Sequence, residues 1–170
     1  MKHQLSHVRA DGSAHMVDVT GKDITSRNSR AQAVIHTRKE VLHMIAEADL
    51  PKGDALPVAR IAGIMAAKKA CESIPLCHPI PLGKITVDFE VDPTQGSVTI
   101  ITNVKTKGGT GVEMEALSAA STAALTIYDM IKAADPLAVI TNIKVLEKTG
   151  GKSGDWVADN SEDRTSTPRR

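Results

Sequence analysis

Aromatic side chains are almost absent from this sequence, which has one Phe, one Tyr and one Trp among its 170 residues. Proteins that bind single-stranded nucleic acids stack bases on aromatic rings, and nucleic-acid binders in general carry a basic excess. Here 21 Lys and Arg residues are balanced by 20 Asp and Glu residues, for a formal net charge of +1. We therefore expect no nucleic-acid partner, and a core built from Ala, Ile, Leu, Val and Met.

Long apolar runs are also lacking. No segment approaches the roughly 18 apolar residues that a membrane helix requires, and residues 1–7 carry no apolar stretch of a secretory signal. The cysteines are Cys71 and Cys77, which are enough for one disulfide. Because nothing else indicates a secreted, disulfide-stabilised protein, we expect a cytoplasmic chain with reduced thiols and no membrane partner.

With 41% hydrophobic residues, a chain of this length can bury one core. Strands are predicted at 31–36, 84–91, 97–105 and 139–146. Helices are predicted at 41–49, 54–70 and 112–134, with Asp54 as one N-cap and a capping box from Thr110 to Glu113. This α+β order is typical of a ferredoxin-like sandwich, in which helices pack on one face of a four-stranded antiparallel sheet.

The domain boundaries follow from composition. Residues 1–28 are polar and are expected to run extended over the surface or against a neighbouring subunit. Residues 29–157 form the predicted ferredoxin-like catalytic domain. The polar, charged tail at 158–170 is expected to be disordered.

Two loops before the predicted hairpin carry candidate functional groups. Lys52 precedes a helix start, where a phosphate could join its ammonium group, although a simple turn with a cap explains the same residues. His78 lies in a rigid loop between prolines, which suits a ligand hydrogen bond or acid–base chemistry. Cys71, Cys77 and His78 lack the paired spacing of a zinc site, so we predict no metal ligands.

The long helix predicted at 112–134 has candidate groups at both ends. Glu113 and Glu115 suit its positive N-terminus. Asp129 and Lys132 are neighbours on its surface, either as an ordinary ion pair or as a proton-handling pair. Glu113 and Asp129 are 16 residues apart in sequence, or about 24 Å at 1.5 Å per residue. One small ligand hardly reaches both ends, so we predict an oligomer with active sites between subunits.

The loop at 148–154 contains two lysines among glycines, whose exposed N–H groups let an anion approach. It lacks the spacing of a Walker loop. A flexible basic loop without a ligand remains the alternative.

Seven motifs then occur together and in order: HMVDV at 15–19, KGD at 52–54, ARIAGI at 59–64, IPLCHP at 74–79, GVEMEAL at 111–117, IYDMIKA at 127–133 and GGKSG at 150–154. Through them the chain resembles the molybdenum cofactor biosynthesis protein C family, the cyclic pyranopterin monophosphate synthases, from about His15 to Trp156. The resemblance implies a lyase that converts 3′,8-cyclo-7,8-dihydro-GTP into cyclic pyranopterin monophosphate and releases pyrophosphate.

The resemblance also implies a homohexamer of three dimers with interfacial active sites, and a radical-SAM GTP cyclase as the source of the substrate. Whether that cyclase makes contact with this protein stays open. No cofactor is required, and Mg²⁺ accompanying the triphosphate stays open. The implied catalytic residues are Asp129, Lys52 and Lys132. The implied substrate contacts are Leu76, Cys77, His78, Glu113, Met114 and Glu115.

The chemistry suits these residue types. Rebuilding a purine-derived ring system requires several proton transfers between positioned acids and bases. Clustered lysines bind phosphates, and their mutual repulsion can favour a neutral amine that acts as a base. Lys132, Lys148 and Lys152 are our candidates to stabilise the departing pyrophosphate. Two other functions remain open, namely a non-catalytic anion-binding regulator and a metal-dependent phosphohydrolase.

Overall fold

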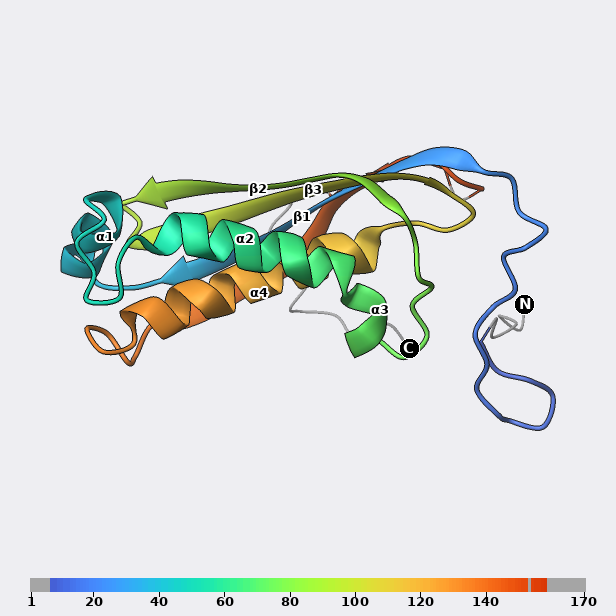
Figure 1. Ribbon diagram of the computed structural model, residues 1–170, viewed down its shortest axis with the longest axis horizontal. Coiled ribbons are helices and arrows are strands. Elements are labelled where there is room, and N and C mark those ends of the chain that lie inside the picture. The colour runs from blue at the N-terminus through green and yellow to red at the C-terminus, as the bar shows by residue number, and fades with distance from the viewer. Residues whose placement is uncertain (1–6, 153, 159–170) are drawn as a thin grey trace.

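The computed structural model describes residues 7–152 and 154–158 and is built on one antiparallel sheet in the order β2-β3-β1-β4-β5. Figure 1 shows β1, β2 and β3 side by side in this sheet. The strands are β1 (Thr25–His36), β2 (Leu82–Asp92), β3 (Ser97–Gly108), β4 (Val139–Thr149) and β5 (Trp156–Val157). β1 is central and pairs with both β3 and β4. The α+β class is as predicted.

The fifth strand corrects the prediction of a four-stranded sheet. β5 is two residues long and pairs with Glu147 and Lys148 of β4. Two residues carry no visible alternation, so the returning loop and not a local pattern sets this strand. The amide of Gly150 donates to Asp155 Oδ1 at 2.9 Å inside that loop. Apart from Ala158, the tail predicted at 158–170 lies outside the described residues.

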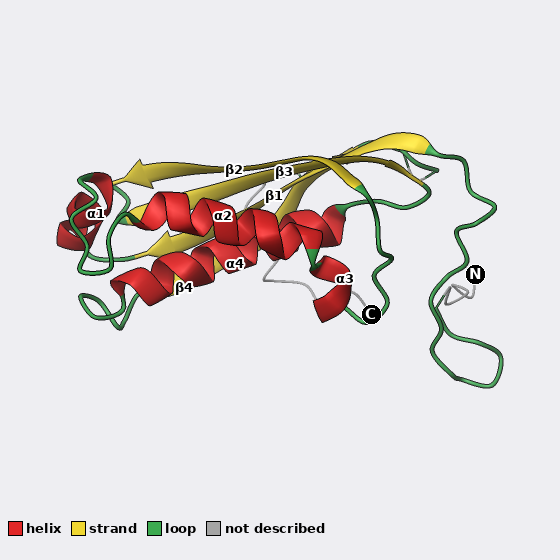
Figure 2. Cartoon of the chain, in the orientation of Figure 1, coloured by secondary structure: helices red, strands yellow, loops and turns green. Residues whose placement is uncertain are grey.

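In the described residues, four helices accompany the sheet: α1 (Lys39–Ala46), α2 (Ala55–Lys68), α3 (Ala70–Ser73) and α4 (Glu113–Ile131). α2 and α4 lie side by side across one face of the sheet (Figure 2). The predicted cap of α2 is confirmed, because the Asp54 side chain accepts a hydrogen bond from the Leu56 amide at 3.3 Å. No helix in the described part of the chain is long and apolar enough to cross a bilayer.

Small side chains allow these two helices to approach each other closely. α4 buries a row of alanines: Ala116, Ala119, Ala120, Ala123 and Ala124. On α2, a Cβ added at Gly63 would lie 3.0 Å from the Ala119 carbonyl oxygen and 3.1 Å from Val87 Cγ2. The core therefore fills its space by close backbone approach and branched aliphatic side chains, with little need for aromatic residues.

The predicted capping box at the start of α4 is wrong. The N-cap position is Val112, with φ −121° and ψ 28°, and no side chain caps the helix. The Glu113 carboxylate instead pairs with Lys148 Nζ of β4 at 3.1 Å. A contact between residues far apart in sequence thus replaces the local bond that the spacing predicted.

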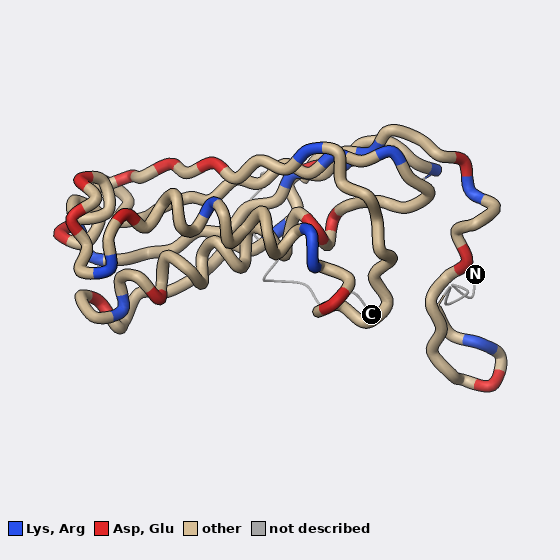
Figure 3. The backbone as a smooth tube through the Cα atoms, in the orientation of Figure 1, with Lys and Arg blue, Asp and Glu red and all other residues tan. Residues whose placement is uncertain are grey.

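Charge is separated along the sheet although the net charge is only +1 (Figure 3). Lysines lie on β2 and β3 beside the start of β1: Lys84, Lys105 and Lys107. Acidic residues lie farther along β2: Asp88, Glu90 and Asp92. The basic end of the sheet is the end at which β3 leads into α4.

Candidate active site

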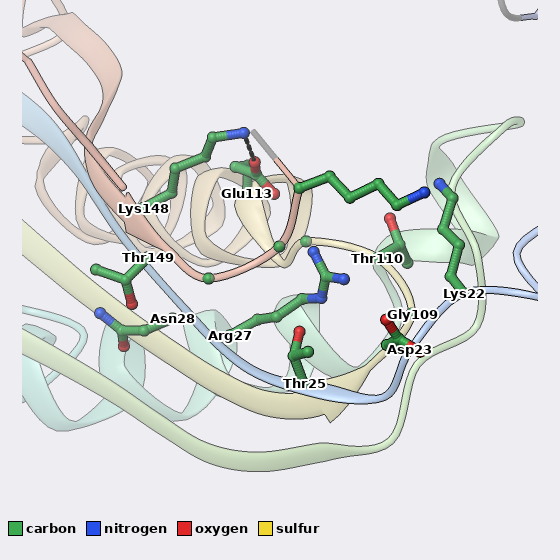
Figure 4. Close-up of a pocket in the computed structure, with 14 residues that line it drawn as sticks. Lys22, Asp23, Thr25, Arg27, Asn28, Gly109, Thr110, Glu113, Lys148 and Thr149 are labelled. Carbon is green, nitrogen blue, oxygen red and sulfur yellow. Dashed lines mark ion pairs between the residues drawn. The ribbon is translucent and has the colours of Figure 1, made fainter. Parts of the chain in front are cut away.

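A cavity of about 560 Å³ opens near the N-terminus of α4, between the start of β1 and the end of β4 (Figure 4). Its charged lining consists of four cations and two carboxylates: Lys22, Arg27, Lys148, Lys152, Asp23 and Glu113. Two glycine-containing loops, 109–111 and 150–151, complete the wall. Such a cationic wall suits an anionic ligand.

Arg27 is held at this wall by the backbone. Its Nε donates to the carbonyl oxygen of Gly108 at 2.8 Å. Gly150 and Gly151 have φ of +86° and +85°, a region that L side chains rarely adopt. A Cβ at Gly151 would overlap the Arg27 guanidinium, and one at Gly150 would overlap the Ser26 carbonyl oxygen. Gly151 therefore makes room for the arginine, and Gly150 makes room for the backbone at Ser26.

A second cavity of about 300 Å³ adjoins the first, and Lys22, Thr110, Gly111 and Glu113 line both. Its remaining lining comes from three segments: His7, Val17 and Val19; Leu76, Cys77, His78 and Ile80; Met114 and Glu115. The loop before β2, the first turn of α4 and the N-terminal segment thus meet in one place.

Cys77, which is half-buried, and Glu115, which is buried, form a polar pair in this second cavity. Glu115 is 3% exposed, and the Cys77 Sγ–H donates to its Oε1 at 3.4 Å. Burial raises the pKa of Glu115, and burial together with the Glu115 charge raises the pKa of Cys77 to about 12. Cys77 is therefore a neutral thiol at physiological pH, which argues against a thiolate nucleophile.

The three predicted catalytic residues meet at the other end of α4. Lys52 Nζ lies 2.7 Å from Asp129 Oδ2, and Lys132 Nζ lies 2.7 Å from Asp129 Oδ1. Lys52 also donates to the Asp129 carbonyl oxygen at 3.0 Å. Hydrogen bonds from Lys132 and then from Lys52 lower the pKa of Asp129 to about 2. The carboxylate is therefore ionised at neutral pH.

The idea that repulsion between lysines makes one of them neutral is not supported by this arrangement. Asp129 lies between the two ammonium groups and offsets their repulsion. Its hydrogen bond and its charge raise the pKa of Lys132 above the ordinary value of 10.5. In the single chain Lys132 is a charged donor and not a ready base.

Asp135 fixes the loop that follows Lys132. It is 6% exposed, and its Oδ2 accepts from Thr37 Oγ1 at 2.7 Å and from the Arg38 amide at 3.1 Å. Its Oδ1 accepts from the Leu137 amide at 3.2 Å. These bonds tie the end of α4 to the end of β1.

The predicted site residues therefore fall into two groups. Eight of them line the two cavities at the start of α4: Leu76, Cys77, His78, Glu113, Met114, Glu115, Lys148 and Lys152. Lys52, Asp129 and Lys132 line neither cavity. Within one chain, the two groups are separated by the 16 residues from Glu113 to Asp129, about 24 Å of helix.

Lys22 and Arg27 are lining residues that the sequence analysis did not single out. Lys22 lies in the segment predicted to be extended, and Arg27 lies in a strand that begins six residues earlier than predicted. Lys22 follows Gly21, whereas Arg27 has no glycine or proline beside it. Only the pairing of β1 with β3 and β4 brings them to the loops at 109–111 and 150–151.

Metal ligands do not gather in the described residues. No group of three or more His, Cys, Asp or Glu side chains lies close enough there to hold an ion. The fold and the two sites together define a small α+β protein with a cationic, glycine-walled cavity of the kind used for phosphorylated small molecules.

Comparison with known proteins identifies the family. The chain belongs to the MoaC family, whose model matches residues 16–151. It is 67% identical over 153 residues to the cyclic pyranopterin monophosphate synthase of Corynebacterium efficiens, covering 90% of this chain and 97% of that protein. The synthase of Corynebacterium glutamicum has the same identity and coverage. That of Nocardioides sp. is 53% identical over 154 residues, with 90% and 94% coverage.

Proposed function

We propose that this chain is a cyclic pyranopterin monophosphate synthase, a phosphorus–oxygen lyase of molybdenum cofactor biosynthesis. It converts 3′,8-cyclo-7,8-dihydro-GTP into cyclic pyranopterin monophosphate and releases pyrophosphate. The observation that carries the proposal is the meeting of eight predicted substrate contacts around two adjoining cavities with a cationic wall. Relatives that carry this name are 53% to 67% identical over nine-tenths of the chain.

The larger cavity suits the triphosphate. Lys22, Arg27, Lys148 and Lys152 supply positive charge, and glycines in the two loops leave the wall without bulky side chains there. As a ribose oxygen attacks the innermost phosphorus, negative charge develops on the departing pyrophosphate, and these cations stabilise it. The smaller, partly apolar cavity, with Leu76, Met114 and the Cys77–Glu115 pair, suits the guanine-derived ring.

The catalytic ammonium groups come from a second protomer. Asp129 lies about 24 Å along α4 from Glu113 at the cavities, and Lys52 and Lys132 are paired with it. One chain therefore does not bring both its cavities and these two lysines to the same substrate. We propose a homohexamer of three dimers in which the end of α4 in one protomer completes the cavities of its neighbour. Asp129 positions Lys52 and Lys132 as charged donors, since its own pKa near 2 leaves it ionised.

The proposal also covers the fold type, the cofactor requirement and the source of the substrate. The order β2-β3-β1-β4 of the four long strands is that of a ferredoxin-like sandwich, with β5 added at one edge. The reaction requires no cofactor, and Mg²⁺ accompanies the triphosphate if it takes part at all. The substrate comes from a radical-SAM GTP cyclase, which is the proposed functional partner in the cytoplasm.

One assay tests the function against its alternatives. The protein is given 3′,8-cyclo-7,8-dihydro-GTP without metal and then with Mg²⁺, and pyrophosphate and pterin fluorescence are followed. Pterin formation with pyrophosphate release is the expected result. Release of simple phosphate would instead indicate a hydrolase, and binding without any product would indicate a regulator. Asp129→Ala is the matched variant, expected to keep the fold and to lose nearly all turnover.

A further inference from the structure

The N-terminal segment touches the second cavity through one short hydrogen bond. His78 Nε2 lies 2.7 Å from the main-chain oxygen of Val17. A carbonyl oxygen only accepts hydrogen bonds, so Nε2 must carry the hydrogen. When the imidazole is neutral, its other nitrogen, Nδ1, is then an unprotonated acceptor.

That acceptor is available to a ligand. His78 lines the second cavity together with Val17. Nδ1 of His78 has no hydrogen-bond partner in the described residues. It is also absent from the set of fully buried polar atoms without a partner, so it is not sealed off inside the protein. His78 therefore lines the same cavity as the Cys77–Glu115 pair, with one ring nitrogen unpaired in the described residues.

The Val17 carbonyl is itself held in place by the segment at 17–22. Asp18 Oδ1 accepts hydrogen bonds from the Thr20 amide at 2.9 Å and from Thr20 Oγ1 at 2.7 Å. The Lys22 amide donates to the Val19 oxygen at 3.1 Å, which closes a turn. A Cβ at Gly109 would lie 3.2 Å from that Val19 oxygen, so the segment packs closely on the loop before α4.

We propose that the main-chain carbonyl of Val17 is a positioning group that fixes His78 as the Nε2–H tautomer. Nδ1 then accepts a hydrogen bond, and in the reaction a proton, from a hydroxyl or ring N–H of the substrate. The bonding pair stays on the substrate atom, and the imidazolium keeps its Nε2–H bond to Val17. The tautomer is a property of the free protein, and only the substrate step rests on the proposed function.

The first test measures the tautomer without substrate. Protein labelled with ¹⁵N in its six histidines is studied by solid-state ¹⁵N NMR at alkaline pH, where imidazole side chains are neutral. The His78 signals are identified by their loss in His78→Gln. A protonated Nε2 and an unprotonated Nδ1 are expected. A protonated Nδ1, or a pair of averaged signals, would overturn the proposal.

A matched pair of variants tests the role of the segment. Asp18→Ala removes the turn that holds Val17, and we expect the two His78 signals to move towards an average. Asp92→Ala removes the same kind of turn, with Thr94 as donor, from the β2–β3 hairpin. It should leave the His78 signals unchanged. If the His78 ¹⁵N signals of Asp18→Ala equal those of the wild type, the segment at 17–22 does not position His78.

Two substitutions of His78 separate its nitrogens. Gln places an amide donor near the Nε2 position and keeps the bond to Val17, but it offers nothing at Nδ1. We expect kcat to fall by about 10²- to 10⁴-fold, the range for one acid–base group. KM should also rise in His78→Gln, because the hydrogen bond at the Nδ1 position is lost. Asn places an acceptor oxygen near Nδ1, so KM in His78→Asn should be closer to the wild-type value while kcat stays low. Wild-type kcat in His78→Gln would overturn the substrate step.

The two proposals fail in different ways. If the wild-type protein does not convert the cyclised dihydro-GTP, the proposed function falls, and the ¹⁵N signals still decide whether Val17 fixes the tautomer. If conversion occurs and the signals show a protonated Nδ1, the function stands and the positioning role falls.

Discussion

Mixing two inactive variants should restore activity if each active site takes residues from two protomers. Asp129→Ala disables the C-terminal end of α4, and Lys148→Ala disables the cavity at its N-terminal end. Each variant alone should lose at least about 10²-fold in turnover, as when one preorganised charge stabiliser is removed. The helix between the two groups is about 24 Å long, which one substrate does not bridge within a chain.

The recovery expected from mixing follows from symmetry. When the two variants are unfolded, mixed in equal amounts and refolded, half of the dimers contain one chain of each kind. In such a dimer, one of the two sites combines the intact cavity of the Asp129→Ala chain with the intact helix end of the Lys148→Ala chain. About a quarter of all sites, and hence about a quarter of wild-type turnover, should return.

Pyrophosphate release and pterin fluorescence measure that recovery. A mixture of Asp129→Ala with Lys52→Ala is the matched control, because both changes disable the same end and no site regains it. Turnover in the first mixture that does not exceed the average of its two components would refute the composite site. Equal recovery in both mixtures would refute the assignment of Lys52 and Asp129 to one end.

Three further predictions concern single features. The pKa of Asp129 in the folded protein is about 2, below its ordinary 3.8. A carboxyl group whose pKa is lowered by folding stabilises the fold at pH values above its unfolded pKa, and this contribution is lost as the pH falls towards 2. Carbon-13 NMR titration of the carboxyl should therefore give a value below 3, and a value near 4 would contradict the two ion pairs. Gly63→Ala should lower the free energy of unfolding in urea by about 1–3 kcal/mol through overpacking, whereas Gly83→Ala, with its nearest neighbour at 3.6 Å, should cost clearly less. Gly151→Ala should raise KM for the substrate, because its Cβ would displace the Arg27 guanidinium; an unchanged KM would remove that arginine from binding.

The sequence predicted those features that depend on local patterns. The alternation along Ile85, Val87 and Phe89 predicted β2, and Asp54 at the right offset predicted the cap of α2. Both signals are decided by neighbours within a few residues. The same local reasoning wrongly predicted a capping box at Thr110, because the Glu113 carboxylate forms an ion pair with Lys148 on β4 instead.

The grouping of the site residues depended on tertiary pairing and so could be predicted only in part. Helix length alone indicated that Glu113 and Asp129 do not meet within one chain. Nothing near Arg27 indicated that strand pairing would bring its side chain against Gly108 and Gly151. The sequence did not predict β5 for a related reason: Trp156 and Val157 pair with β4, and two residues are too few to show an alternating pattern.

Charge balance gives a reason for joining the two ends of α4. The four cations of the larger cavity, less Asp23 and Glu113, leave a net charge of +2, and Lys52 and Lys132, less Asp129, leave +1. A triphosphate carries about one negative charge or more on each phosphate, so the cavity alone leaves part of that charge unbalanced. Because Asp129 is paired with both lysines, the end of a neighbouring α4 would supply the missing positive charge and two hydrogen-bond donors together. Assembly of the protomers would then place Lys52 and Lys132 of one chain beside the cavity of the next, where the phosphates of the substrate are already bound.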